Sequence, residues 1–379
     1  MRIFTVDKII LSPYDIDLSY SPLRKQLDVK TYVLGAFNPG MTKLPDGNLM
    51  IMVRIAEALQ HPVNEAKISA IRWDKKKGYV LDDYKLDQVD TSDPRKFIIK
   101  DFLPNPVFAL TSSSWLLPVE LSANGSEIIR IHYDKIIAPQ KGYQEYGVED
   151  ARISYIKGKY YMTTCSVSSE RHSTTLYTSD DGLNYQLEGI ILDHQNKDMI
   201  LFEGVIDNKY MALTRPLGSS YFATSPHSIF NPGPSINLAQ SPDLLHWKPL
   251  DEPFIRPQKK SGQILKLGGG TPPILTPDGW LVLFHGVEKK EEVGIYRTYW
   301  AILDKINPQK ILHLEMKIPL LEANPGLTSE FREIIYLEDV VFTTGIVKME
   351  DYYIIASGEL DLCTRITHIP KSDFRLNPR

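Results

Sequence analysis

The sequence predicts an all-β protein, and two observations carry the prediction. Short runs rich in aromatic and branched residues each follow a turn signal and a partner segment, which is typical of β-hairpins. No stretch shows the apolar spacing of an amphipathic helix of three turns. The runs are Leu49–Arg54, Lys159–Thr164 and Trp280–His285, and the turn signals before them are Asp46-Gly47, Lys157-Gly158 and Asp278-Gly279.

The hairpins repeat at a long period, which indicates the architecture. Polar landmarks that end in Asp74, Asp134, Asp180, Asp243 and Asp304 recur roughly every 46 to 63 residues. That spacing suits four-stranded antiparallel blades and predicts a β-propeller. The landmarks permit five or six blades, with residues 115–133 as an insertion and not a blade. Two stacked β-sandwiches are the alternative architecture.

Length and composition set the class of protein. The chain has 379 residues, 42% of them hydrophobic, enough for one large core or two ordinary domains. We predict a single propeller domain over residues 1–379, with residues 1–34 packing on it or closing it. The net charge of −4 comes from interspersed acids and bases, so neither a nucleic acid nor a membrane is expected as partner.

The two cysteines and the first residues add little chemistry. Cys165 and Cys363 each lie in an apolar run and are too far apart for a disulfide framework or a metal motif, so we expect core thiols and no metal. The segment Met1–Asp7 has no signal-peptide pattern. We therefore expect a cytoplasmic protein, with a periplasmic or secreted location as the alternative if a signal peptide has been removed.

Carboxylates at strand starts point to a site. Glu149 and Asp150 open one predicted strand, and Glu203 opens another. Adjacent carboxylates are costly to ionise together, and two at separate strand mouths suit glycoside cleavage, which needs an acid and a base on opposite sides of a sugar. The inner strands of a propeller start near one end of its axis. The side chains expected to converge there are those of Asn38, Asp150, Glu203, Thr271 and Asp361.

A series of segments resembles glycoside hydrolase family 130, in the family's order and over nearly the whole chain. The segments are Phe37–Gly40, Val148–Ile153, Ser241–Trp247, Gly268–Ile274, Gly279–Leu281, His285–Val287, Val340–Gly345 and Gly358–Asp361. The resemblance implies a five-bladed β-propeller that cleaves β-linked mannosides with inversion, by phosphorolysis or by hydrolysis. It also implies that Asp150 is the proton donor, in some members through a hydroxyl of the sugar.

The chain departs from this family where the two chemistries diverge. Phosphorylases of the family carry Phe-Pro-Glu-Lys and Leu-His-Arg-Pro, and the matching lysine and histidine here are Val205 and Thr214. A phosphate dianion needs fixed cationic donors, so their loss weakens a phosphate site. Glu203 would repel phosphate and activate water instead. We therefore predict an inverting, β-1,2-mannosidase-like hydrolase, with a mannoside phosphorylase that uses inorganic phosphate as the alternative.

The remaining residues are expected to bind an oligosaccharide, and no other cofactor is implied. The predicted substrate-binding residues are Asn38, Arg54, Glu149, Arg152, Arg215, Thr271, His285 and Asp361. Arg171 and His172 are candidates for a distal sugar or for phosphate, and Glu359 for a second basic carboxylate. Simpler alternatives stay open: Asp150 paired with Arg152, Glu203 capping a turn, and solvated charges elsewhere. A non-catalytic carbohydrate-binding propeller and a five-bladed glycosidase for arabinosides, xylosides or fructosides are the competing functions.

Overall fold

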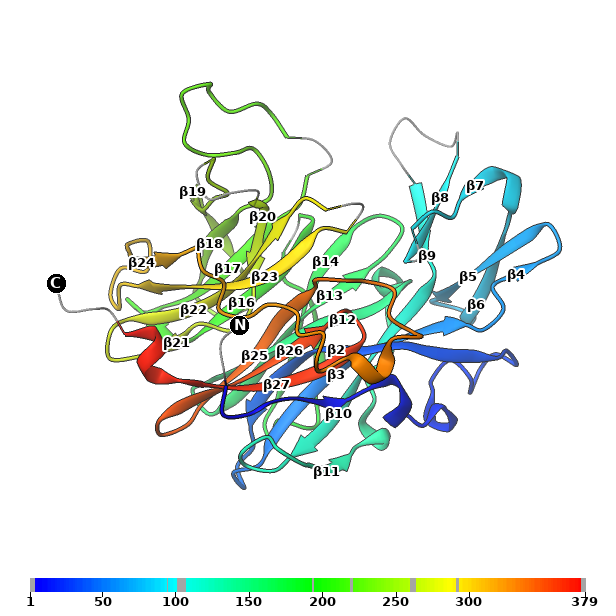
Figure 1. Ribbon diagram of the computed structural model, residues 1–379, viewed down its shortest axis with the longest axis horizontal. Coiled ribbons are helices and arrows are strands. Elements are labelled where there is room, and N and C mark those ends of the chain that lie inside the picture. Colours follow the sequence, from blue (N-terminus) through cyan, green and yellow to red (C-terminus); the bar gives the residue numbers. More distant parts are fainter. Residues whose placement is uncertain are drawn as a thin grey trace.

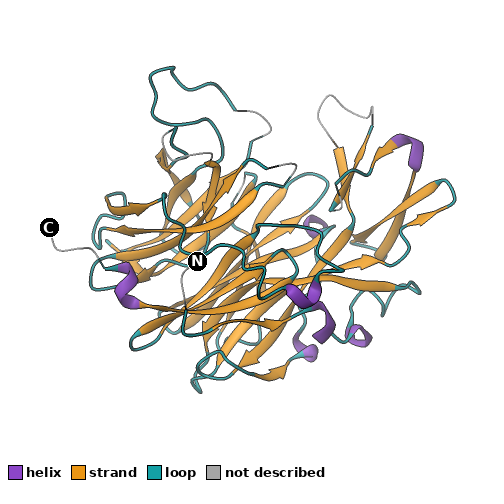
Figure 2. Cartoon of the chain, in the orientation of Figure 1, coloured by secondary structure: helices purple, strands orange, loops and turns teal. Residues whose placement is uncertain are grey.

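The protein is all-β in a computed structural model that describes residues 4–93, 95–100, 107–192, 194–218, 221–259, 264–290 and 293–375. The helices of this part of the chain are 3-10 turns of three or four residues (Figure 2), so the predicted lack of amphipathic helices is confirmed. They are Pro13–Asp15, Leu18–Tyr20, Leu86–Gln88, Tyr133–Lys135, Gly142–Gln144, Ser329–Phe331 and Lys371–Phe374. None of the described helices is long and apolar enough to cross a bilayer.

Most strands belong to antiparallel meanders that follow one another along the chain (Figure 1). The first holds β2 (Thr31–Lys43), β3 (Leu49–Leu59), β10 (Ser112–Leu121) and β11 (Ile128–Ile131). The second holds β12 (Gly147–Ile156), β13 (Lys159–Val167), β14 (His172–Ser179) and β15 (Gln186–Ile190). A parallel pair, Ser114 with Gly147, joins these two into one eight-stranded sheet.

Three further meanders complete this arrangement. The third holds β16 (Asn196–Ile206), β17 (Lys209–Pro216), β18 (Ile236–Ser241) and β19 (Lys248–Ile255). The fourth holds β20 (Ile264–Gly269), β21 (Ile274–Leu275), β22 (Trp280–Glu288), β23 (Ile295–Leu303) and β24 (Ile311–Glu315). The fifth holds β25 (Val341–Lys348), β26 (Tyr352–Glu359), β27 (Cys363–Pro370) and the N-terminal β1 (Asp7–Leu11).

Two small accessory sheets are inserted between β3 and β10 and project from the meanders in Figure 1. One holds β4 (Val63–Asn64), β5 (Lys67–Asp74) and β6 (Gly78–Lys85). The other holds β7 (Val89–Asp90), β8 (Lys96–Ile99) and β9 (Val107–Leu110). The prediction that residues 115–133 are an insertion is therefore wrong, because this stretch supplies β10 and β11.

The landmark at Asp74 marks a local turn, not the end of a meander. Its Oδ1 accepts bonds from the backbone N–H groups of Lys76 and Lys77 in the β5–β6 turn. Asp243 caps the turn between β18 and β19 in the same way, with bonds from the next residues along the chain. Any tight turn can use this aspartate geometry, so the pattern cannot distinguish accessory hairpins from the repeating unit.

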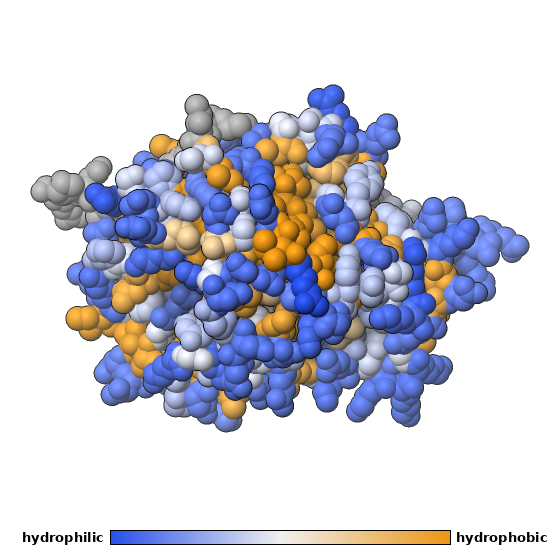
Figure 3. All heavy atoms as spheres, turned by 90° about the horizontal axis from the view of Figure 1, so that it is seen from below, coloured by the Kyte–Doolittle hydropathy of each residue, from blue (hydrophilic) through white to orange (hydrophobic). Residues whose placement is uncertain are grey.

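The core lies between neighbouring meanders. Apolar clusters join the first meander to the second, the second to the third, the third to the fourth and the fourth to the fifth. A further cluster, with Ile51 and Trp115 of the first meander and Ile354 and Ile366 of the fifth, joins the ends of the series. Cys165 and Cys363 are buried free thiols, as predicted. Hydrophilic side chains cover much of the face shown in Figure 3, around apolar ones.

A buried ion network fixes β1 against β27. Arg365 is 2% exposed and donates from Nε and Nη2 to Asp7 Oδ1 and Oδ2 at 2.7 and 2.9 Å. Its Nη1 donates to Glu359 Oε2 at 2.9 Å. Glu359 therefore serves this network, and the expected role as a second basic carboxylate is wrong. The first and last strands of the chain are held together by charges that have little access to water.

This network predicts a large effect of Asp7→Ala on stability. Removing one partner leaves the Arg365 guanidinium buried with half of its compensation, so the free energy of unfolding should fall by about 2 to 4 kcal/mol. Asp83→Ala, which breaks the exposed pair with Lys67, is the control and should cost less than about 1 kcal/mol. Urea denaturation measures both changes, and equal losses would contradict the structural role of Asp7.

Candidate active site

The first strands of three meanders share a backbone feature that turns side chains toward one pocket. Asn38, Asp150 and Asp198 have positive φ angles of 51°, 51° and 56°. In each strand, β2, β12 and β16, the register with the next strand shifts at this point, which marks a bulge. Asparagine and aspartate tolerate the left-handed conformation better than most residues, and bulges redirect side chains. All three side chains line one pocket.

The pocket has a volume of about 290 Å³ and is rich in charge. Its cationic side chains are Arg54, Arg95, Lys96, Lys197 and Arg215, and its carboxylates are Glu149, Asp150, Asp198 and Asp361. His172 also lines it, together with the rings of Phe37, Phe108, Tyr296, Tyr336 and Phe342. Convergent charged donors beside aromatic rings suit a polar ligand with apolar faces. Among the described residues no group of histidine, cysteine and carboxylate side chains could hold a metal ion.

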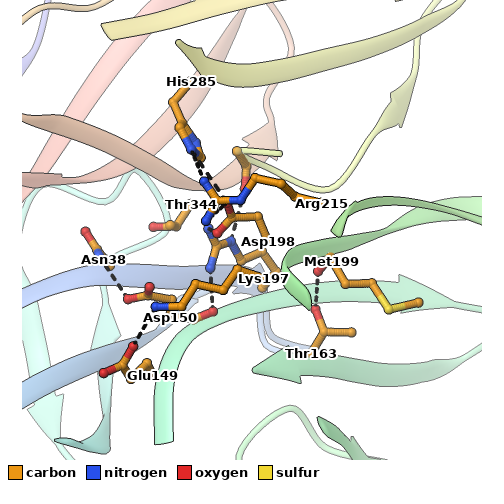
Figure 4. A network of polar contacts seen from close by, with 12 residues as sticks. Asn38, Glu149, Asp150, Thr163, Lys197, Asp198, Met199, Arg215, His285 and Thr344 are labelled. Carbon is orange, nitrogen blue, oxygen red and sulfur yellow. Dashed lines mark hydrogen bonds and ion pairs between the residues drawn. The ribbon is translucent and has the colours of Figure 1, made fainter. Parts of the chain in front are cut away.

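Asp150 lies at the centre of the polar network (Figure 4). Its Oδ1 accepts bonds from Asn38 Nδ2 at 2.9 Å and Arg54 Nη1 at 3.1 Å. Burial raises the pKa of Asp150, but the nearby charges of Arg54, Arg152 and Lys197 outweigh this and hold its pKa below the usual range. The carboxylate is therefore ionised at neutral pH.

Glu149 and Lys197 belong to the same network as Asp150. Glu149 Oε1 accepts from Arg54 Nη2 at 2.8 Å, and its Oε2 lies 3.4 Å from Lys197 Nζ. Burial lowers the pKa of Lys197, but the charge of Glu149 outweighs this and raises it overall, so the ammonium stays protonated. Glu149 thus forms ion pairs with two cations, Arg54 and Lys197, beside Asp150.

A second network, also in Figure 4, is built around the buried carboxylate of Asp198. Its Oδ1 lies 3.2 Å from Arg152 Nη2 and its Oδ2 lies 3.0 Å from Arg215 Nη2. His285 Nε2 is 3.5 Å from Oδ2, and burial lowers the pKa of this imidazole to about 3, so the ring is neutral. Arg152 also donates to the carbonyl of Asp150 at 2.6 Å. One carboxylate therefore holds two arginines from neighbouring meanders.

Only glycine fits at position 268, where β20 of the fourth meander packs against this network. A Cβ at Gly268 would lie 2.4 Å from Asp198 Oδ2 and 2.5 Å from the imidazole of His285. Those contacts are too short for any side chain, so the three consecutive glycines noted in the sequence allow β20 to approach the site. The backbone carbonyl of Gly270 accepts a bond from Arg152 Nε at 3.3 Å.

His172, Lys197 and Arg215 form one cationic cluster in the pocket wall. Burial and the charge of Lys197 lower the pKa of His172 to about 3, so its ring is neutral and presents one N–H and one lone pair. Lys197 and Asp198 were not predicted from the sequence. The signal that could have found them is the Asn196–Asp198 segment at the true start of β16, a few residues before the predicted start.

Glu203 lies outside this pocket, and the prediction that it reaches it is wrong. The strand β16 begins at Asn196, so Glu203 lies toward the other end. Its Oε1 accepts a bond from the Tyr155 backbone N–H at 3.2 Å, and burial raises its pKa to about 7. Glu203 is not among the residues that line the pocket, so its carboxylate is not placed on the face of a bound sugar opposite Asp150.

Other predicted residues divide into those in the pocket and those behind it. Asn38, Arg54, Arg215, His172 and Asp361 line the pocket. Arg152 and His285 do not line it but contact side chains that do. Thr271 is fully buried and Arg171 is not among the lining residues, so neither is placed to meet a ligand there.

Comparisons with known proteins identify the family of this chain. The family described as beta-1,4-mannooligosaccharide phosphorylase matches residues 111–374, most of the chain. The chain belongs to this family, glycoside hydrolase family 130, as the resemblance predicted.

Individual relatives match over most of their length. The beta-1,2-mannobiose phosphorylase of Listeria innocua is 30% identical over 356 residues, which cover 90% of this chain and 93% of that protein. A 1,2-beta-oligomannan phosphorylase of Thermoanaerobacter is 28% identical over 67% of this chain and 78% of its own. The solved Listeria innocua beta-1,2-mannobiose phosphorylase, in complex with beta-1,2-mannobiose, superposes with a TM-score of 0.78, 27% identity and 97% coverage of both chains.

The pKa of Asp361 is raised, whereas the pKa of Asp150 is lowered. The raised pKa predicts that Asp361 makes the free energy of unfolding depend on pH. Burial is the main reason that the pKa of Asp361 rises from 3.8 to about 6, and the Asp150 charge adds to it against the Arg54 charge. The protonated carboxyl therefore contributes stability below about pH 4 that is lost as pH rises through 6. Asp361→Asn should raise the free energy of unfolding at pH 7.5 by at most about 3 kcal/mol and change it little at pH 4.

Guanidinium denaturation across this pH range tests the Asp361 effect. The exposed Asp351→Asn is the matched control and should follow the wild-type curve. Parallel curves for wild type and Asp361→Asn would mean that Asp361 titrates like an exposed aspartate.

Proposed function

We propose that this protein is an inverting β-mannoside phosphorylase with β-1,2-mannobiose and related β-1,2-mannosides as substrates. The observation that carries the proposal is the cationic cluster of His172, Lys197 and Arg215 beside Asp150, in a pocket that Glu203 does not enter. The cluster supplies the lysine and imidazole whose absence at positions 205 and 214 favoured hydrolysis. Phosphorolysis therefore replaces hydrolysis as the preferred chemistry.

Phosphate fits the charge of this cluster. A dianion needs several fixed donors, and Lys197 and Arg215 offer an ammonium and a guanidinium that are held in place by Glu149 and Asp198. These two acids balance the charges of the two cations. Bound phosphate would draw on both cations and on the neutral imidazole of His172, which can donate one hydrogen bond.

The proton balance suggests how Asp150 takes part. Hydrogen phosphate attacks the anomeric carbon from the face opposite the leaving oxygen, so the β-bond breaks and an α-mannosyl phosphate forms. Overall one proton moves from hydrogen phosphate to the leaving oxygen. The neighbouring cations keep Asp150 ionised at neutral pH, but a phosphate dianion nearby raises the pKa of a carboxyl group. Asp150 then acts as the proton donor, directly or through a sugar hydroxyl, as the family resemblance implies.

The relatives support the substrate class and the linkage. Two of them are named as phosphorylases of β-1,2-linked mannosides, and both match this chain over two thirds of its length or more.

We also propose that the five meanders are the blades of a single five-bladed propeller. The ring of apolar clusters and the pairing of β1 with β27 support this arrangement, with the pocket at the axis.

Product analysis tests this function. The protein is incubated with β-1,2-mannobiose and with β-1,4-mannobiose, with and without millimolar phosphate. We expect α-mannose 1-phosphate and mannose from the β-1,2-disaccharide in phosphate, and no cleavage without it. Mannose 1-phosphate and mannose should also yield the disaccharide in the reverse direction. Release of free mannose at the same rate in phosphate-free buffer would instead establish hydrolysis.

The cationic cluster predicts a selective effect of Lys197→Met. Loss of one charge-assisted contact to phosphate should raise the KM for phosphate about 10- to 100-fold, with a smaller change in the KM for the mannoside. Lys159→Met, at the β12–β13 turn and outside the pocket lining, is the control. Equal changes in both KM values would mean that Lys197 does not bind phosphate.

A further inference from the structure

The three bulges that turn side chains into the pocket share one pattern of strand pairing. In β2, β12 and β16, two residues face a single residue of the next strand, and the first of the two has the left-handed backbone. In β16 the two residues are Asp198 and Met199, which lie opposite Thr214 of β17. A bulge disrupts the ladder and leaves the extra residue unpaired, so a buried backbone group there needs another partner.

A buried threonine hydroxyl supplies such a partner in β16 (Figure 4). Thr163, on β13 of the second meander, donates from Oγ1 to the carbonyl of Met199 at 2.6 Å. Both residues are buried, so water has little access to compete for this bond. The bond therefore joins the second meander to the third at the residue directly after Asp198.

The bulge in β2 is held in the same way. Thr344 of β25, in the fifth meander, is fully buried and donates from Oγ1 to the carbonyl of Pro39 at 2.9 Å. Pro39 directly follows Asn38, as Met199 follows Asp198. In both bulges, the carbonyl after the left-handed residue is therefore bound by a hydroxyl from a neighbouring meander.

The threonine bonds bear on the site because each bulge residue holds another group of the pocket. Asp198 Oδ2 lies 3.0 Å from Arg215 Nη2, and Asn38 Nδ2 donates to Asp150 Oδ1 at 2.9 Å. A left-handed backbone is strained for a residue other than glycine and persists only where the surrounding structure holds it. Without the hydroxyl, the buried carbonyl is left unpaired, and a rotation of the peptide that relieves this also turns the neighbouring side chain.

We propose that Thr163 is a positioning residue, whose hydroxyl holds the β16 bulge and thereby fixes Asp198 and Arg215 for phosphate. Thr344 has the corresponding role at the β2 bulge, where it fixes Asn38. The expected effect on phosphate rests on the proposed phosphorolysis, whereas the effect on the position of Asp198 does not.

Steady-state kinetics of Thr163→Val test this role. Valine keeps the branched shape but lacks the donor, so the KM for phosphate should rise about 3- to 10-fold, with a smaller change in the KM for β-1,2-mannobiose. Thr163→Ser keeps a hydroxyl and should retain a KM for phosphate close to that of wild type. Thr344→Val should instead lower kcat about 3- to 10-fold with little change in the KM for phosphate, because it disturbs the Asn38 amide that orients Asp150.

The matched control is Ser154→Ala. Ser154 Oγ donates to the carbonyl of Leu201 at 3.0 Å, so this variant also removes a buried hydroxyl bond between the second and third meanders. Leu201 lies outside the Asp198 bulge, opposite Ala212 of β17, and the KM for phosphate should stay at the wild-type value. An equal rise of this KM in Ser154→Ala and Thr163→Val would mean that the hydroxyls only stabilise the fold, and would overturn the proposal.

Crystal structures of wild type and Thr163→Val distinguish this proposal from the proposed function. The distance from Asp198 Oδ2 to Arg215 Nη2 should be longer in the variant. An unchanged distance overturns the positioning role, whichever reaction the wild type catalyses. A wild type without phosphate-dependent cleavage overturns the proposed function, and the two structures then still decide the role of Thr163. If Thr163→Val does not fold, Thr163→Ala, which also lacks the donor, is measured in the same way.

Discussion

The charge of the pocket depends on one buried carboxylate, that of Asp198. Arg152 and Arg215 come from neighbouring meanders, and isolated guanidinium groups would be costly to bury at these positions. Asp198 offsets this cost and fixes both side chains. Because the left-handed backbone at Asp198 aims the carboxylate inward, the geometry of one bulge sets the positions of two arginines on two other strands, β12 and β17.

Much of the fold could be predicted from the sequence because the turns and strands are local features. The hairpins after Asp46, Lys157 and Asp278 form in the structure. The number of repeats was harder to predict from the sequence, because an aspartate-capped turn occurs both in the meanders and in the accessory hairpin at Asp74. Nothing local to residues 63–110 indicates that they form an insertion that returns to the site.

The site was predicted in part, and the misplacement of Glu203 has a physical cause. Asn38, Asp150 and Asp361 line the pocket, because Asn38 and Asp150 lie at bulges within β2 and β12 and Asp361 lies in the turn after β26. Glu203 was misplaced because the predicted strand starts at Leu201, within the apolar run Met199–Phe202, whereas the strand begins at Asn196. The polar start of β16 carries Lys197 and Asp198. Because the strand start was predicted too late, Glu203 was assigned to the site and these two residues of the network were missed.

The pairing of β1 with β27 sets the order in which this protein can be completed during synthesis. Asp7 meets its partners only when residues 363–370 are available, and Arg365 follows it by 358 residues. The earlier meanders can form their hairpins as they emerge, because their contacts are local. The strand β1 must wait without its partner until β27 is made, so the growing chain carries an unpaired β-strand while β2 to β26 are synthesised.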